Sequence, residues 1–368
     1  MPSEIRAAVL SSPNRRFTVE RLTLADPRKG EVRVRISACG VCHSDWHVAT
    51  GDTKHPMPCV AGHEGAGVVQ EVGPGVDDLK VGDSVVLSWA PDCGNCFYCL
   101  HGKANLCEEF VGPLWDGVML DGEPRLSCNG KPVYHYCGLA AFAEAVVVPA
   151  ICCVKAPSDL APEVAALVGC AVATGVGAVL YSAGVKPGES VAVYGCGGVG
   201  LSILQGAKIA GAGPIIAVDR AQAKRELCLS MGADDFVLAT DRTVEEIRAR
   251  TDGRGADWVF EAIGVPSVQE KALDAVRPGG GLVLVGLAPM GTATNFPSAS
   301  LARTEKRVIG SYYGGVQPQR DFPMLLEWAE SRKLNLAPMI SKRWKLDEIN
   351  EAFAEMLSGD VGRGVIVF

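Results

Sequence analysis

The chain has 368 residues, of which 48% are hydrophobic and 21% are charged, and its formal net charge is −7 at pH 7. This length exceeds that of one ordinary domain, so two domains are expected. The acidic balance leaves no basic stripe, which argues against nucleic acid as a partner. The 14 cysteines suit a reducing compartment and residues 1–6 do not resemble a secretory signal, so the expected location is cytoplasmic.

The first part of the chain, from about residue 5 to residue 154, has the pattern of a mostly β domain. Short valine-rich runs, such as residues 31–36, 67–72 and 83–88, alternate with glycine and proline turns. Two short motifs lie between these runs, Cys39-Gly-Val-Cys-His-Ser-Asp45 and Gly62-His-Glu-Gly-Ala-Gly67. Taken alone, a buried cysteine or a single histidine is usually a core residue, so neither motif identifies a site.

Four cysteines follow within fifteen residues, with two, two and seven residues between them: Cys93, Cys96, Cys99 and Cys107. This spacing matches a closed site of four thiolates around zinc, which is a structural metal site. The surrounding loop, residues 91–108, has little apolar material with which to order itself without a metal. Disulfides are disfavoured in a reducing compartment, and free surface thiols rarely have ligand spacing.

Residues 164–185 form a stretch of 22 residues without a charge, which is long enough to span a bilayer. The stretch contains four glycines and Cys170. We therefore interpret it as a buried helix between the two domains, with Cys170 at the start of a helix rich in glycine and alanine, and expect no membrane partner.

After Cys170 the pattern changes to apolar runs of strand length separated by segments compatible with helices. The runs are residues 191–195, 215–219, 235–238, 258–261 and 282–286. This alternation predicts a doubly wound parallel sheet, so the fold class is α/β. Helices are also predicted over residues 322–333 and 346–357 and a strand over residues 307–312.

A glycine-rich segment directly follows the first of these runs: Gly195, Cys196, Gly197, Gly198, Val199 and Gly200. Such a segment between a strand and a helix is a dinucleotide-binding fingerprint, in which backbone amides and the helix N-terminus accommodate a pyrophosphate. Asp219 ends the next strand, where a carboxylate accepts the ribose hydroxyls of NAD and repels the 2′-phosphate of NADP. The neighbouring Arg220 leaves NADP open, because an arginine there can accommodate that phosphate.

Together these motifs resemble the zinc-dependent medium-chain alcohol dehydrogenases of the long, liver-like type, including aryl and benzyl alcohol dehydrogenases and related bacterial members. The resemblance runs nearly end to end and implies a GroES-like catalytic domain, residues 1–171 and 315–368, with a structural zinc lobe. It implies a Rossmann cofactor domain over residues 172–314. Residues 111–137, which the tetrameric branch tends to lack, imply a homodimer.

The resemblance implies two zinc ions per chain. Cys42, His63 and Cys170 would hold the catalytic ion, with a fourth position open, while the four closely spaced cysteines hold the structural ion. Glu64 matches a carboxylate near the catalytic metal, and Asp45 matches the residue that orients the His63 ring.

The implied activity is NAD-linked, reversible oxidation of primary alcohols, aromatic or of medium chain length, to aldehydes by hydride transfer from an alkoxide at the zinc. Ser44 would take the alcohol proton, the cofactor ribose would carry it, and His47 would deliver it to solvent. Further cofactor contacts are implied for His43, Thr174, Lys224 and Arg363. Trp89 and Tyr136 match aromatic walls of the substrate pocket.

His43 departs from the pattern of many liver-type members, which carry arginine beside the pyrophosphate. An imidazole loses its charge as the pH rises past about 6.5, whereas arginine stays charged, so we expect NADH binding to weaken at alkaline pH. The replacement of His43 by arginine should remove this weakening.

Three other functions stay open at this stage. One is a formaldehyde dehydrogenase that acts on an S-hydroxymethyl thiol adduct, although the glutathione branch carries an acidic residue and an arginine where this chain has Thr53 and Val111. Another is an alcohol oxidoreductase that retains its nicotinamide and uses an artificial acceptor. The last is a non-catalytic scaffold that binds zinc and NAD, against which the intact ligand set argues.

Overall fold

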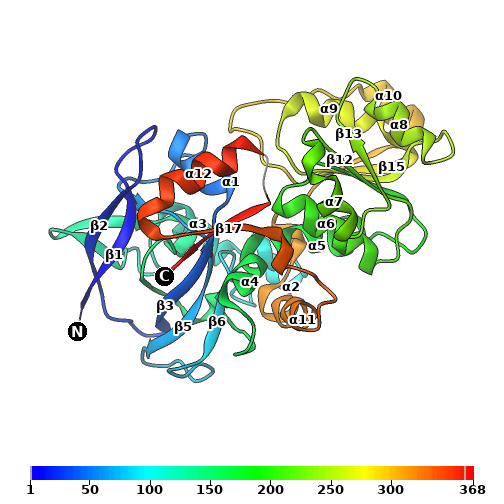
Figure 1. Ribbon diagram of the computed structural model, residues 1–368. Coiled ribbons are helices and arrows are strands. Elements are labelled where there is room, and N and C mark those ends of the chain that lie inside the picture. The colour runs from blue at the N-terminus through cyan, green and yellow to red at the C-terminus, as the bar shows by residue number, and fades with distance from the viewer. Residues whose placement is uncertain (1, 360–361) are drawn as a thin grey trace. The chain divides into compact units, whose positions relative to one another are not determined.

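The computed structural model describes residues 2–359 and 362–368, and the chain divides into two compact units. Unit 1 comprises Met1–Cys170, Gln317–Ser358 and Arg363–Phe368, and unit 2 comprises Ala171–Val316 and Gly359–Gly362. Figure 1 shows the elements of both units along the chain.

Unit 1 is mostly β, as the valine-rich runs predict. Five strands form a closed barrel in the order β1 (Ser3–Leu10), β2 (Thr18–Leu24), β7 (Leu126–Cys128), β8 (Lys131–His135) and β4 (Cys59–Val60). The second sheet has the order β10 (Cys153–Lys155), β6 (Ser84–Leu87), β5 (Glu64–Val72), β3 (Glu31–Gly40), β18 (Arg363–Val367) and β17 (Ile340–Trp344), and β9 (Ala145–Pro149) also pairs with β3. The long antiparallel pairing of β3 with β5 ends where Gly40 faces Glu64, which brings two of the predicted site segments together.

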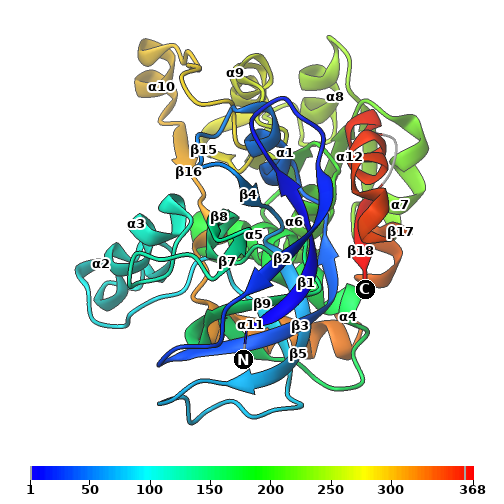
Figure 2. The ribbon, with the colours of Figure 1, turned by 90° about the vertical axis from the view of Figure 1, so that its left-hand side faces the viewer.

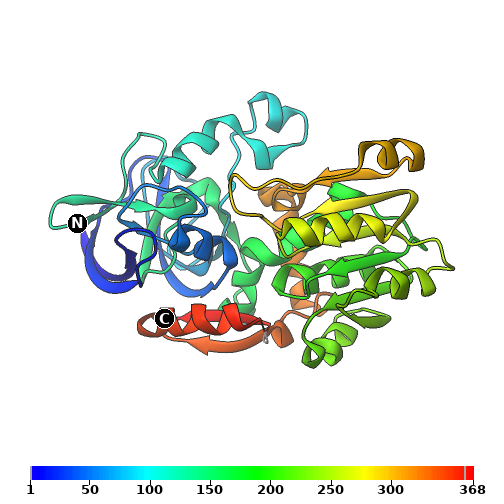
Figure 3. The ribbon, with the colours of Figure 1, turned by 90° about the horizontal axis from the view of Figure 1, so that it is seen from above.

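Short helices join and cover the strands of unit 1. They are α1 (His43–Thr50), α2 (Phe97–Leu100), α3 (Glu108–Asp116), α4 (Pro162–Leu167), α11 (Pro318–Glu330) and α12 (Ile349–Ser358). Figure 2 shows α2 and α3 projecting from the side of the unit, and the four closely spaced cysteines belong to this projection. In Figure 3 the red α12 runs along the C-terminal strands, and it packs against β18.

Unit 2 is a doubly wound parallel sheet. Its strand order is β13 (Asp235–Leu238), β12 (Ile215–Asp219), β11 (Val191–Tyr194), β14 (Ala256–Glu261), β15 (Val276–Leu284) and β16 (Arg307–Gly310). The order reverses between β11 and β14, which is the switch point at which such sheets bind ligands. The α/β fold class with a Rossmann unit and a GroES-like unit is thereby confirmed.

Helices lie on both faces of the sheet of unit 2. Figure 1 shows α6 (Gly198–Ile209) and α7 (Arg225–Ser230) on one face, and α9 (Pro266–Asp274) and α10 (Ser298–Thr304) on the other. The unit also contains α5 (Ala173–Gly177) and α8 (Thr243–Ala249). Apolar strand residues, among them Ile216, Val218 and Val259, are buried between these layers, as the continuous apolar runs require.

Two predicted boundaries shift for local reasons. The helix predicted over residues 322–333 begins at Pro318, because proline suits the first turn, and ends at Glu330, shortly before Arg332 takes a left-handed φ of 59°. The strand predicted over residues 282–286 begins earlier, at Val276, and ends at Leu284.

The prediction that Cys170 opens a helix is wrong. Helical structure begins at Pro162, and Cys170 lies in the middle of a π-helical stretch, Val168–Val172. Such stretches insert extra residues into a helix and are frequent at functional sites. The helical segment Pro162–Ala183 is apolar and long enough to cross a membrane, but 89% of its most apolar window is buried inside the protein, which is the environment of a core helix.

Candidate active site and metal centres

The first candidate metal centre brings together Cys42, His63 and Cys170, although Cys42 and Cys170 are 128 positions apart in the sequence. Cys42 is the N-cap residue of α1, and His63 directly precedes β5. One ligand atom from each of these side chains, and one from Glu64, lie within 4.8 Å of one another, and all four residues are buried.

The orientation of the His63 ring suits a metal. Its Nδ1 donates to Asp45 Oδ1 over 3.0 Å, and the same oxygen accepts the Gly62 amide over 2.8 Å. Nε2 is then the nitrogen that faces the two thiols, and this buried atom has no other hydrogen-bond partner among the described residues. A buried set of two thiols and one oriented imidazole fits zinc in a site with an open position.

The two thiols of this centre are electrostatically coupled. A hydrogen bond from Cys170 lowers the pKa of Cys42 well below its ordinary value, and the same bond raises the pKa of Cys170. A divalent cation bound at this centre would take both sulfurs as thiolates.

Glu64, whose carboxylate belongs to this cluster, is paired with Arg363. The Arg363 side chain donates to Glu64 Oε1, and both side chains are buried. Burial raises the pKa of Glu64 to about 7, and the positive charge of Arg363 opposes that rise. The pair requires the glycine at position 40, because a Cβ there would stand 2.1 Å from Glu64 Oε2.

Helix α1 carries the two residues of the implied proton relay. Ser44 Oγ lies 3.8 Å from Cys42 Sγ, which places the hydroxyl beside the first metal centre. His47 follows one turn later, and its Nδ1 lies 3.3 Å from Asp52 Oδ2. Thr50 Oγ1 donates to the same oxygen over 2.7 Å. Sequence reasoning missed Asp52, because its contact with His47 depends on the turn that ends the helix at Gly51.

The second candidate metal centre consists of the four closely spaced cysteines. Their sulfur atoms lie within 4.8 Å of one another, with 3.4 Å between Cys96 and Cys99. Backbone amides point at the sulfurs: Cys93 Sγ accepts the amides of Asn95 and Cys96, and Cys107 Sγ accepts that of Cys93. Amide donors stabilise thiolates, so the loop fits a closed four-thiolate zinc site.

The dinucleotide fingerprint of unit 2 has the geometry that its glycines predict. Gly195 has a φ of +88°, and a Cβ on Gly200 would stand 1.8 Å from the Gly195 carbonyl oxygen. A Cβ on Gly197, the N-cap of α6, would meet no atom of the described chain within 4 Å. The tight turn, the close packing and the open approach to the amides are the three requirements of a pyrophosphate site.

Asp219 is fixed beside this fingerprint. Its carboxylate accepts the Cys196 amide over 2.8 Å, the Ala221 amide over 2.9 Å and Lys224 Nζ over 3.2 Å. The buried Lys224 is thus positioned by Asp219, whereas Arg220 is exposed.

The remaining predicted cofactor residues lie on three different elements. Thr174 is buried on α5, which packs directly on the start of α6, because a Cβ on Gly175 would stand 2.6 Å from the Val199 carbonyl oxygen. His43 is exposed at the start of α1. Arg363, for which the sequence implied a pyrophosphate contact, is bonded to Glu64 in unit 1.

Two aromatic rings lie beside the His63 ring of the first metal centre. The Trp89 and Tyr136 rings stand edge-on to His63, with centroids 6.4 and 5.7 Å away. Trp115, from the end of α3, lies 6.4 Å from Tyr136 and extends this wall. Sequence reasoning missed Trp115, since only folding of the segment after the four cysteines brings it to Tyr136.

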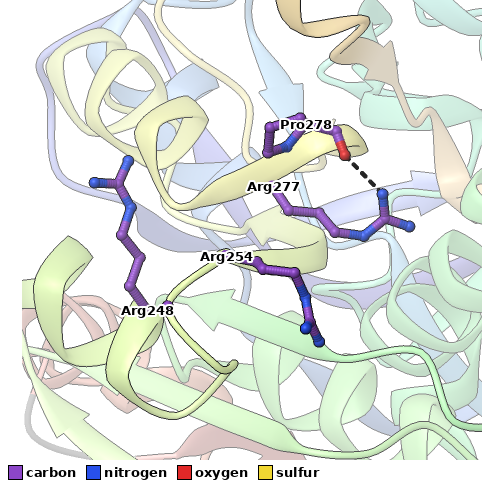
Figure 4. Close-up of a pocket in the computed structure, with 5 residues that line it drawn as sticks. Arg248, Arg254, Arg277 and Pro278 are labelled. Atoms are coloured by element: carbon purple, nitrogen blue, oxygen red, sulfur yellow. Dashed lines mark hydrogen bonds between the residues drawn. The ribbon is translucent and has the colours of Figure 1, made fainter.

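A separate hollow of about 620 Å³ lies in unit 2, where β14 and β15 begin. Figure 4 shows its arginines, Arg248, Arg254 and Arg277, pointing in different directions. Two of them are paired with acidic residues, Asp252 and Asp257. The hollow lies where these parallel strands begin, whereas the fingerprint lies where β11 ends, and none of the predicted site residues lines the hollow.

A Rossmann unit with a dinucleotide fingerprint, a GroES-like unit, a buried centre of two thiols and an imidazole and a second centre of four thiols define a zinc-dependent dehydrogenase. The sequence profile described as zinc-binding dehydrogenase matches residues 198–331, and that described as alcohol dehydrogenase GroES-like domain matches residues 28–158. The chain belongs to the zinc-dependent medium-chain alcohol dehydrogenase family. It is an NAD-dependent alcohol oxidoreductase, with zinc as its metal.

Similar proteins cover the chain almost completely. An NDMA-dependent alcohol dehydrogenase of Amycolatopsis methanolica is 38% identical over 365 residues, 98% of each chain. An S-(hydroxymethyl)glutathione dehydrogenase of Synechocystis is 39% identical over 98% of this chain and 99% of its own. Among solved structures, benzyl alcohol dehydrogenase of Acinetobacter calcoaceticus has a TM-score of 0.93 and 31% identity, with 100% of this chain and 99% of the other covered.

Proposed function

We propose that this enzyme oxidises primary alcohols with an aromatic or medium-length apolar tail reversibly to aldehydes. The observation that carries the proposal is the buried cluster of Cys42, His63 and Cys170 with aromatic rings beside it. In this proposal these three residues hold the catalytic zinc, and the four closely spaced cysteines hold the structural zinc. Trp89, Trp115 and Tyr136 offer flat apolar surfaces on which an aromatic tail can pack.

Bound zinc lowers the pKa of an alcohol hydroxyl and bound NAD accepts a hydride, and the residues of the chain supply the rest. Ser44 Oγ would accept the proton of the alcohol while its own proton passes, through the ribose hydroxyl of bound NAD, to His47, and His47 would release a proton to solvent. Asp52 holds His47 Nδ1 and so leaves Nε2 available to accept that proton. Asp45 keeps the His63 ring in the orientation that binds metal.

The proposed cofactor site is the fingerprint of unit 2. Gly195, Gly197 and Gly200 give the pyrophosphate access to the backbone amides, with Gly198, Val199 and Thr174 alongside. Asp219 and Lys224 take the ribose hydroxyls, which favours NAD over NADP. The exposed residues His43 and Arg220 are proposed as further contacts of the cofactor. Arg363 is also proposed as a cofactor contact, while it keeps its bond to Glu64.

We further propose a cytoplasmic homodimer. Its domains would be those expected from the sequence, residues 1–171 with 315–368 and residues 172–314. The parallel sheet of unit 2 ends in β16, whose outer edge pairs with no strand in the part of the chain that the structure describes. An open strand edge can continue its sheet in a second copy. Sedimentation equilibrium supports the dimer at twice the chain mass and contradicts it at one or four times that mass.

Two alternatives are supported by the names of similar proteins. One relative is named as an S-(hydroxymethyl)glutathione dehydrogenase and another as an NDMA-dependent alcohol dehydrogenase. Thr53 and the exposed Val111 offer no charge to the carboxylates of a peptide thiol, which counts against the first. The names of the relatives support the use of an artificial electron acceptor as well as the thiol-adduct activity, so both activities are assayed.

The test is an initial-rate assay on protein of known zinc content. Benzyl alcohol, hexanol and a secondary alcohol are each supplied with NAD or with NADP, and formaldehyde is supplied with and without glutathione. The proposal expects the highest kcat/KM with benzyl alcohol or hexanol and NAD. Turnover only with formaldehyde and a thiol, or only after addition of an artificial electron acceptor, contradicts it and selects one of the alternatives.

A further inference from the structure

The hydroxyl group of Tyr136 bonds to the first turn of α1. It donates to the backbone carbonyl oxygen of Ser44 over 3.2 Å. The ring itself is held between three others, because His55, His63 and Trp115 pack against it at 5.5, 5.7 and 6.4 Å between centroids. A ring so enclosed has little freedom to rotate, so its hydroxyl is a fixed donor.

The carbonyl that receives this bond lies in the first turn of α1, which the buried Asp45 and the Tyr136 hydroxyl attach to the rest of unit 1. The side chain of the N-cap residue, Cys42, makes no capping hydrogen bond to α1. The bond that closes the first turn, from the Trp46 amide to the Cys42 carbonyl oxygen, is long at 3.4 Å. This turn carries Cys42 at its N-cap and Ser44 at its second position. Its attachments to the rest of unit 1 therefore decide where the Ser44 hydroxyl lies.

The backbone around Tyr136 is shaped to deliver its side chain. Cys137 and Ala140 have left-handed φ values of 53° and 61°, which non-glycine residues adopt only when their surroundings impose it. The following amides of Ala141 and Phe142 bond to the carbonyl oxygens of Gly62 and Ala61. The strained turn is thus fastened to the segment that ends in His63.

We propose that Tyr136 is a positioning residue for proton transfer, because its hydroxyl fixes the turn of α1 that places Ser44 beside the metal centre. The inference rests on the proposed function, in which Ser44 accepts the alcohol proton. In this proposal the Tyr136 side chain has two roles: its ring forms part of the wall of the substrate pocket, and its hydroxyl keeps Ser44 in position for proton transfer.

The replacement Tyr136→Phe keeps the ring and removes the hydroxyl, and Tyr134→Phe makes the same change two residues earlier on β8. We expect Tyr136→Phe to lower kcat for benzyl alcohol about 3- to 10-fold, the equivalent of one hydrogen bond, with KM within about twofold of the parent value. The solvent deuterium isotope effect on kcat should increase, because proton transfer becomes slower. Tyr134→Phe should match the parent in all three quantities.

A second readout does not depend on turnover. Amide hydrogen exchange of residues 43–50, followed by mass spectrometry, should be faster in Tyr136→Phe than in the parent and unchanged in Tyr134→Phe. Parental exchange, or parental kcat and isotope effect, in Tyr136→Phe would overturn the proposal, and a rise in KM alone would assign the hydroxyl to substrate binding instead. If the parent oxidises no alcohol, the proposed function fails, while exchange still decides whether the hydroxyl holds the turn.

Discussion

The replacement Asp45→Asn should selectively weaken the catalytic metal centre. Asp45 is fully buried, and its Oδ1 accepts both His63 Nδ1 and the Gly62 amide, at 3.0 and 2.8 Å. Asparagine can keep those contacts with its carbonyl oxygen, but it removes the negative charge that holds the imidazole proton on Nδ1 and makes Nε2 a stronger ligand. It also places an amide group where Asp45 Oδ2 lies buried without a partner among the described residues.

Loss of such a partner lowers metal affinity about 10- to 100-fold, which corresponds to about 1.4–2.8 kcal/mol. The assay is release of zinc to a chromogenic chelator, in which the parent should show two ions per chain of different lability. In Asp45→Asn the catalytic ion should leave at a chelator concentration that spares the parent, while the structural ion stays bound. Asp52→Asn is the matched control, since it removes a carboxylate from the other end of α1 without touching a metal ligand.

The reasoning is refuted if Asp45→Asn retains both ions as firmly as the parent does. It is also refuted if Asp52→Asn loses the catalytic ion equally, because the effect would then come from general destabilisation of α1.

Three other predictions concern the structural lobe, acid stability and cofactor choice. Cys107→Ser should reduce the zinc content from two ions to one and lower Tm, and a variant with both ions contradicts the four-cysteine assignment. Burial lowers the pKa of His135 to about 3 and that of His55 to about 4. Below about pH 6.5 the unfolded chain therefore binds a proton at each histidine and the folded chain does not. The free energy of unfolding should fall as the pH is lowered from 6.5 toward the pKa values of the folded chain. From pH 6.5 to 5 each histidine should lower the free energy of unfolding by about 1.6 kcal/mol, measured by urea unfolding. An equal loss in the parent and in His135→Gln contradicts this. Asp219→Ser should reduce the NAD-to-NADP ratio of kcat/KM about tenfold, as expected for one charge-assisted bond, and an unchanged ratio would assign the preference elsewhere.

The sequence was most informative where function depends on neighbours in the chain. The four cysteines converge because their loop is short, and the three glycines of the fingerprint meet their requirements within one strand, turn and helix. Both sites could therefore be predicted from spacing alone. The valine-rich and apolar runs likewise predicted the two kinds of sheet, since burial on one or both faces dictates those patterns.

Sites assembled from distant segments were not accessible in this way. No spacing rule relates Cys42, His63 and Cys170, and only the likeness to a family selected the two cysteines among 14 and the histidine among 6. The bond of Arg363 to Glu64 and the contact of Trp115 with Tyr136 depend on tertiary packing, which leaves no periodic signal. The π-helical turn at Cys170 was missed for the same reason, because its pattern does not differ from that of an ordinary apolar helix.

The central claim, hydride transfer from an alcohol to NAD at the Cys42, His63 and Cys170 centre, is tested most directly by isotope transfer. Benzyl alcohol deuterated at both positions of its CH₂ group is incubated with NAD and protein that contains two zinc ions per chain, and the reduced cofactor is analysed by mass spectrometry. The account predicts one deuterium per reduced nicotinamide, and none of this product after replacement of Cys42 by alanine. Reduced cofactor without deuterium, or deuterium transfer that persists in the Cys42→Ala protein, would contradict it.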